Sequence, residues 1–216
     1  MFKEIIVGKT LGFTGHRPPE FGGYDNDDSE IVIKTKENIS NIIREAYYDY
    51  GVTKFITGMA LGLDTWAGLE VLKFQEEIDT LIANGNTDLS KIGLIAAIPF
   101  ASQAKIWRNT KDVYTWKNII SKCYRIYVCE QEKYYSLSSF KELYEISNNT
   151  NNAAKYLFLR NLWMVDNSDY YCAAWNGKEN GGTYNCVKYL QNKNIPFWHY
   201  NPNTFEVVKQ KFEIKE

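Results

Sequence analysis

The sequence predicts an α/β protein of the Rossmann-like type, a three-layer sandwich in which helices cover both faces of a mostly parallel sheet. Short apolar runs alternate with amphipathic stretches along the chain, which is the pattern of repeated β-α-β units. The run at residues 92–98 is almost continuously apolar, as expected for a strand that is buried on both faces. Together these two observations indicate a parallel sheet between two helical layers.

The predicted strands and helices alternate from end to end. The strands are expected at residues 9–13, 52–57, 92–98, 124–128, 170–175 and 195–200. The helices are expected at residues 29–50, 64–78, 103–120, 153–165 and 182–191. Ser29 is the candidate N-cap of the first helix and Gly51 ends it. The polar segment at residues 130–152 breaks this rhythm, so we expect a mobile flap or an oligomer contact there, outside the central sheet.

Length and composition exclude several classes of protein. The 216 residues suffice for one domain with a substantial core, so residues 1–216 are expected to form a single domain with a polar insertion around residues 130–152. A net charge of -1 and only five arginines give no general attraction to nucleic acid or to an anionic membrane. The chain has no apolar run of about 18 residues and no signal-peptide pattern. A cytoplasmic location and a homo-oligomer are expected.

The cysteines carry no sign of a metal site. Cys123, Cys129, Cys172 and Cys186 match no zinc-ligand spacing, and a chain of this length needs no disulfide. We expect them to be reduced and mostly buried, with Cys123 and Cys129 on one face of a strand. Neither a metal ion nor a cofactor is predicted.

Ligands of such sheets bind at the carboxyl ends of the strands, so the turns from strand to helix are where a site is expected. The turns after the first, second and fifth predicted strands are rich in glycine, which allows close approach of the backbone to a ligand. Free amides at a helix N-terminus also favour an anion. The candidate residues in these turns are Gly15, His16, Arg17, Gly58, Ala60, Gly62, Asp64, Gly181, Gly182 and Thr183. For Asp64, a role as helix cap stays open.

Five blocks of the sequence, taken in order, are similar to one known family. They lie at residues 12–18, 58–67, 96–107, 160–166 and 181–183. In this order they resemble the YspA/YpsA-like branch of the SLOG superfamily, which includes the Lonely-guy phosphoribohydrolases and the DNA-processing protein A family. The resemblance covers about residues 9–200 and implies a Rossmann-like fold that binds nucleotides or nucleotide-derived small molecules. The blocks add Pro99, Gln103, Arg160, Asn161 and Asp166 to the candidate nucleotide-binding residues.

Arg160 and Asp166 suit opposite parts of a nucleotide. The planar guanidinium of an arginine fits a phosphate, and an aspartate fits ribose hydroxyls. In the family context we expect both to contact the ligand, with a surface ion pair between them as the alternative, which would stabilise the fold little.

The block at residues 180–186 favours ligand binding over hydrolysis of an N-glycosidic bond. The Lonely-guy enzymes carry Pro-Gly-Gly-x-Gly-Thr-x-x-Glu, whose Glu takes part in glycosidic cleavage, whereas this chain lacks the third glycine and the acid. We therefore expect a protein that senses or sequesters a nucleotide-derived metabolite, for example in a bacterial or phage conflict system. The alternative is an N-glycosidic-bond hydrolase of nucleoside phosphates that uses Asp64, Glu70 or Asp166 as acid or base. Single-stranded DNA binding fits the charge poorly.

Overall fold

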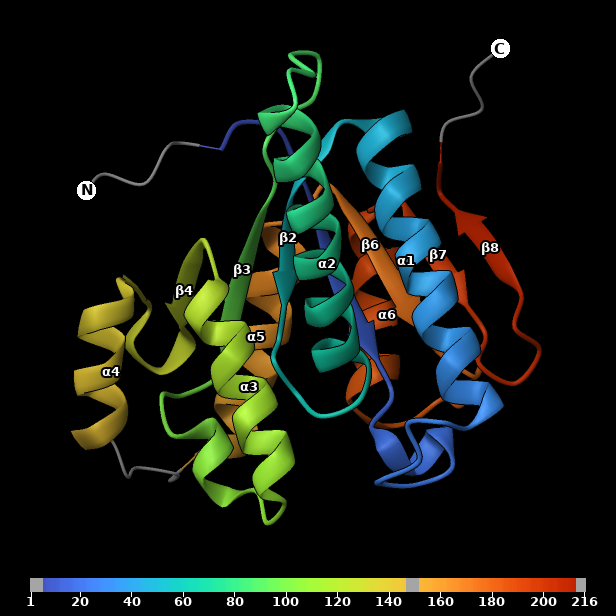
Figure 1. Cartoon of the computed structure of the whole chain (residues 1–216). Helices are drawn as coiled ribbons and strands as arrows, with labels where there is room; N and C mark the ends of the chain where they lie inside the picture. Colours follow the sequence, from blue (N-terminus) through green and yellow to red (C-terminus); the bar gives the residue numbers. More distant parts are fainter. Residues whose placement is uncertain (1–5, 147–151, 213–216) are drawn as a thin grey trace.

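The computed structural model describes residues 6–146 and 152–212, and its strands form one eight-stranded sheet (Figure 1). The strand order is β5-β4-β3-β2-β1-β6-β7-β8. The strands are β1 (Lys9–Gly15), β2 (Val52–Thr57), β3 (Gly93–Ile98), β4 (Arg125–Val128), β5 (Lys133–Tyr135), β6 (Tyr170–Ala174), β7 (Phe197–Tyr200) and β8 (Val207–Gln210). The six inner strands are parallel, and the edge strands β5 and β8 pair antiparallel with β4 and β7.

Helices cover both faces of this sheet. They are α1 (Glu30–Tyr50), α2 (Leu63–Ala83), α3 (Thr110–Lys122), α4 (Leu137–Ile146), α5 (Ala153–Asp166) and α6 (Gly181–Lys193), with short 3₁₀ helices at Pro18–Phe21, Gln103–Ile106 and Cys129–Gln131. Helices α1, α2 and α3 lie in front of the sheet in Figure 1, and α5 and α6 lie behind it. The predicted three-layer α/β fold is confirmed.

Strand β3 shows why the apolar run predicted a doubly covered strand. Leu94, Ala96 and Ile98 belong to the core beneath α1, α2 and α3. The residues between them, Ile95 and Ala97, belong to the core beneath α5 and α6. Because successive side chains of a strand point to opposite faces, a strand between two helical layers has to be apolar at every position.

The predicted helix at residues 103–120 is wrong at its start. A 3₁₀ helix covers Gln103–Ile106, and α3 begins only at Thr110. The side chain of Asn109 accepts a hydrogen bond from the Lys111 amide at 2.9 Å, so this residue caps a new helix. The first helix follows the prediction more closely: Ser29 is the N-cap residue, and Gly51 ends α1 in the left-handed conformation with φ of 69°.

The expectation that residues 130–152 lie outside the sheet is wrong for β5. This short strand pairs with β4, with Tyr135 opposite Ile126. Helix α4 then packs Phe140, which is 2% exposed, against the ring of Trp116. The polar run at residues 147–151 lies outside the described residues. The edge strand β8 also went unpredicted, because exposed edge strands lack the continuous apolar signal of buried ones.

The cysteines are buried and free as expected, but two of them lie elsewhere than predicted. Cys123 ends α3 and Cys129 begins the 3₁₀ helix after β4, so they flank this strand instead of sharing one of its faces. The described residues contain no group of three or more His, Cys, Asp or Glu side chains able to hold a metal ion. Across the same residues, we find no helix with the length and apolar character that a membrane span requires.

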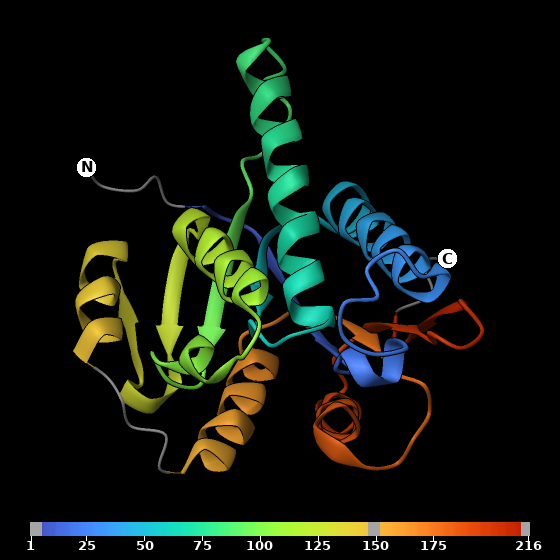
Figure 2. The same cartoon turned by 60° about the horizontal axis from the view of Figure 1, so that its bottom comes forward.

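The order of the strands creates a switch point beside β1. From β1 the chain builds the sheet in one direction through β2, β3 and β4, and it later returns to the other side of β1 with β6 and β7. The crossover helices change from one face of the sheet to the other at this point. The turns at the carboxyl ends of β1, β2 and β6 come together at this edge, which Figure 2 turns toward the reader. In parallel sheets, ligands bind at such edges.

Candidate functional site

His16 joins the turn after β1 to the turn after β6. Its side chain is only 8% exposed, and its Nε2 atom accepts a hydrogen bond of 3.1 Å from the Asn176 amide. An accepting Nε2 requires the neutral ring with its proton on Nδ1. Burial lowers the pKa of His16 from its ordinary value of 6.5. The neutral imidazole is therefore a structural link between the two turns.

The glycines of the first two turns let these turns pack closely together. A Cβ atom on Gly15 would lie 2.7 Å from the Cβ atom of Leu63. A Cβ atom on Gly62 would lie 2.8 Å from the carbonyl oxygen of His16, and Gly62 also has a φ of 92° that favours glycine. These two predicted residues are needed for contact within the protein.

The cap role that the sequence left open for Asp64 is wrong, because the N-cap of α2 is Gly62 and Asp64 is the second residue of this helix. Its Oδ2 atom accepts a hydrogen bond of 3.2 Å from the Ala60 amide, and its backbone carbonyl accepts one of 2.6 Å from the Thr57 hydroxyl. The side chain is buried, with 8% of the residue exposed. Asp64 and Ala60 thus hold the turn between β2 and α2 in shape.

Arg160 is the buried partner of this turn. The residue is 4% exposed, and its Nη1 atom donates to the carbonyl oxygens of Gly58 and Ala97. The same atom lies 3.6 Å from Oδ2 of Asp64. Burial raises the pKa of Asp64 and lowers that of Arg160, and the attraction between the two charges opposes both shifts. The partner of Arg160 is therefore Asp64, and not Asp166 as the alternative proposed.

Gln103 and Pro99 support the same turn from the end of β3. The Gln103 Nε2 atom donates to the carbonyl oxygens of Gly58 at 3.4 Å and Met59 at 3.2 Å. Within the described part of the chain, its Oε1 atom has no hydrogen-bond partner. The carbonyl oxygen of Pro99 accepts a hydrogen bond of 2.9 Å from the Glu130 amide. Both predicted residues are buried and lie at the carboxyl end of β3.

The first turn of α6 is open. A Cβ atom on Gly181 would meet nothing within 4 Å, and one on Gly182 would meet only Nδ2 of Asn161, at 3.9 Å. The N-cap residue Asn180 gives no side-chain hydrogen bond to this helix end. Thr183 is 8% exposed, and the described residues offer its hydroxyl no hydrogen-bond partner. The backbone at Gly181 and Gly182 is therefore open to approach from outside.

Asn161 connects the buried pair to this open end. Its Oδ1 atom accepts a hydrogen bond of 2.9 Å from Nε of Arg160. Because the oxygen is engaged in this way, the amide nitrogen is the atom nearest to Gly182. Arg160 thereby orients a hydrogen-bond donor toward the N-terminus of α6.

Arg17 supplies an accessible positive charge beside these turns. It is exposed, and its charge, like that of Arg160, opposes the rise that burial causes in the pKa of Asp64. None of the residues that the structure describes forms a hydrogen bond or an ion pair with its guanidinium. Lys178, in the turn after β6, adds a second exposed cation, which contacts Glu20 at 3.4 Å.

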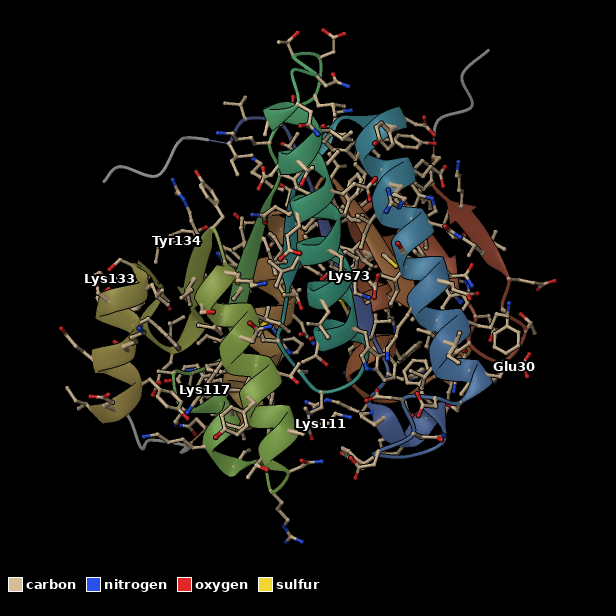
Figure 3. The ribbon with its side chains drawn as sticks, viewed as in Figure 1. Glu30, Lys73, Lys111, Lys117, Lys133 and Tyr134 are labelled. Carbon is tan, nitrogen blue, oxygen red and sulfur yellow. The ribbon has the colours of Figure 1, made fainter. Side chains whose placement is uncertain are left out.

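Asp166 lies away from the other predicted residues. It ends α5 before β6 begins, at the opposite edge of the sheet, where Lys193 contacts its Oδ1 atom at 2.9 Å and the Tyr189 hydroxyl donates to it at 3.0 Å. Glu70 pairs with Lys73 at 2.6 Å, and Figure 3 labels Lys73 on α2. The three acids considered for a hydrolase, Asp64, Glu70 and Asp166, thus have three different cationic partners.

Asn176 and Lys178, in the turn after β6, were not among the predicted site residues. Asn176 donates its backbone amide to His16, and its Oδ1 atom accepts a hydrogen bond from the Lys178 amide at 3.1 Å. Their only signal in the sequence is their place between the fifth predicted strand and the glycine pair. A search of the whole turn for side chains that shape it would have included them.

Comparison with known proteins adds two findings to this geometry. Residues 11–202 match the family described as the YspA SLOG family. The chain is also 26% identical, over 177 residues, to the uncharacterized SPbeta prophage-derived protein YoqJ of Bacillus subtilis (strain 168). This match covers 80% of the chain and 90% of YoqJ. The family match spans all three glycine-rich turns.

Proposed function

Because the chain belongs to the YspA SLOG family, we propose that it binds the phosphate of a nucleotide or a nucleotide-derived metabolite at the N-terminus of α6, and that it senses or sequesters this ligand. The observation that carries the proposal is the open, uncapped first turn of α6 at the switch point of the sheet. The unpaired amides and the dipole of a helix N-terminus both favour a phosphate.

Two side chains at the open turn, and Arg17 from the turn after β1, suit a phosphate ester. The Thr183 hydroxyl and Nδ2 of Asn161 are hydrogen-bond donors without a partner among the described residues. Arg17 offers an exposed and unpaired guanidinium, which suits a phosphate as a fork of donors. The proposed site thus combines backbone amides, neutral donors and one cation.

Arg160 has a different part in this proposal from the one the sequence suggested. Its guanidinium is buried and contacts Gly58, Asp64 and Asn161. The positive charge of Arg160 is therefore paired within the protein and is not available to a ligand. We assign it the role of a positioning residue, which orients Asn161 and supports the second turn. Arg17 replaces it as the arginine that contacts the ligand.

The geometry favours binding over hydrolysis. Cleavage of an N-glycosidic bond by paired acids requires two carboxyl groups that converge on one sugar. Asp64 is held by Arg160 and the Ala60 amide, while Asp166 lies at the opposite edge of the sheet. A ligand at the N-terminus of α6 would therefore contact hydrogen-bond donors, and not two carboxyl groups that could act as acid and base.

A thermal-shift screen tests the proposal. Nucleoside monophosphates, dinucleotides, cyclic dinucleotides and ADP-ribose are each added to the purified protein. A ligand at a hundred times its dissociation constant stabilises the folded state by about 2.7 kcal/mol, which is easily detected. Chromatography of the incubated ligands then reports any release of free base. Rapid release would favour the hydrolase, and the absence of any stabilising phosphate ligand would contradict the proposal.

A further inference from the structure

A groove between α5 and α6 begins at the proposed phosphate site. It has a volume of about 280 Å³ and shares Gly182 and Asn161 with that site. This size lies near the lower limit of small-molecule pockets, which is about 300 Å³. A ligand held by its phosphate at Gly182 therefore has one adjoining space for the rest of the molecule.

The walls of this α5–α6 groove are mainly apolar. Leu157, Phe158 and Leu162 line it from α5, at the spacing of one helix face. Phe158 is 51% exposed, and no other described aromatic ring contacts it. An exposed aromatic side chain of this kind is available to stack on a flat ring.

Two amide groups complete the groove. Asn161 presents Nδ2 at its inner end, and Asn185 is an exposed residue on the α6 side. Asparagine amides combine a donor and an acceptor and pair well with the polar edge of a nucleobase. No Lys, Arg, Asp or Glu side chain lines the groove, so a neutral ring fits it better than a second phosphate.

We propose that the α5–α6 groove binds the nucleobase of the ligand, so that the ligand class is a nucleoside monophosphate or a derivative that keeps one base next to one phosphate. This inference rests on the proposed function, because the phosphate at Gly182 fixes where the groove is entered. Phe158 stacks on the base, and Asn185 contacts its edge, while Asn161 stays at the phosphate end of the groove.

The test compares adenosine and guanosine monophosphate with ribose 5-phosphate, which lacks the base. Calorimetry should show that at least one of the two nucleotides binds about fivefold or more tightly than ribose 5-phosphate, because stacking of one base contributes roughly this much or more. Ala154→Trp, at an exposed position that lines the groove, should remove this preference and leave the affinity for ribose 5-phosphate unchanged. Lys155→Trp is the matched control, since Lys155 is the next exposed residue and does not line the groove.

Three outcomes would overturn the inference, and they are distinguishable. Equal affinities for ribose 5-phosphate and both nucleotides would place the base outside the groove while the phosphate site stands. A shift from dimer to monomer in Ala154→Trp, with an unchanged preference for the base, would assign the groove to a second copy of the chain. If none of the three compounds binds, the phosphate site fails and the inference fails with it.

Discussion

The turns after β2 and β6 are both rich in glycine, and the structure gives their glycines opposite surroundings. A Cβ atom on Gly58 would overlap the guanidinium of Arg160 and lie 2.7 Å from Oδ2 of Asp64. A Cβ atom on Gly182 would have only Asn161 nearby, at 3.9 Å. The turn after β2 is filled by the protein's own charged pair, and the turn after β6 is free.

This difference separates two uses of glycine that look alike in a sequence. At Gly58 the missing side chain allows another part of the protein to approach the backbone. At Gly182 it leaves the backbone accessible from outside, which is what a bound phosphate requires. We therefore regard the turn after β2 as a support and the turn after β6 as the proposed phosphate site. Substitutions in and around the two turns test this difference.

The largest effect is expected from Arg160→Ala. Removing one member of a buried ion pair leaves an uncompensated charge on Asp64, at a cost of about 3–5 kcal/mol in the free energy of unfolding. Arg44→Ala is the control, because Arg44 forms an exposed pair with Glu77 at 2.6 Å, which contributes about 1 kcal/mol or less. Urea denaturation measures both. Equal losses in the two variants would show that the buried pair is not the support described here.

Alanine at the two glycines gives the next largest difference. Gly58→Ala forces a side chain into Arg160 and Asp64, and overpacking of this kind costs about 1–3 kcal/mol. Gly182→Ala meets free space in the first turn of α6 and should change the free energy of unfolding by less than about 1 kcal/mol. Urea midpoints of both variants test this contrast. A Gly182→Ala variant as unstable as Gly58→Ala would mean that the turn after β6 is not open.

A smaller effect is expected from Arg17→Ala. Loss of an exposed contact to a phosphate lowers the binding free energy by about 1 kcal/mol, or affinity by about fivefold, and makes the remaining binding less sensitive to salt. Arg108→Ala removes another exposed arginine, at the start of the α3 region, and should leave affinity unchanged. Calorimetric titrations at two salt concentrations compare the variants. An Arg17→Ala variant with the affinity and salt dependence of the wild type would exclude the contact.

The smallest effect concerns pH and His16. Its pKa is lower in the folded state than its ordinary value of 6.5, so the unfolded chain binds the proton more readily. The stability is complete above pH 6.5 and is lost as the pH falls from there toward the folded pKa, with a slope of at most about 1.4 kcal/mol per pH unit for one proton. His16→Gln should flatten this dependence, and His199→Gln should retain it. An unchanged pH profile in His16→Gln, measured by urea denaturation, would contradict the assignment.

The sequence was informative about the fold because burial leaves a periodic signal. Strand β3 is apolar throughout, so its double coverage could be predicted. The edge strand β5 and the break before α3 depend on a short antiparallel pairing and on one capping side chain, Asn109, which periodicity does not register. Local hydrogen bonds determine where β5 forms and where α3 begins.

The candidate site was predicted in position more fully than in role. The sequence placed the three glycine turns at one end of the sheet and Asp166 at the turn before β6. It could not show that Arg160 is buried against Asp64. This contact depends on how α5 packs on the sheet. Asn176 was missed because its contribution to His16 is a backbone amide, which any residue could supply.

We infer that the open N-terminus of α6 holds the phosphate of the ligand. Calorimetric titration of the best ligand from the thermal-shift screen into wild type and Gly182→Val tests it most directly, with urea denaturation as the check on folding. We expect Gly182→Val to keep the stability of the wild type to within about 1 kcal/mol and to lose binding, because its side chain occupies the space of the phosphate. A folded Gly182→Val variant that binds this ligand with wild-type affinity would contradict the claim.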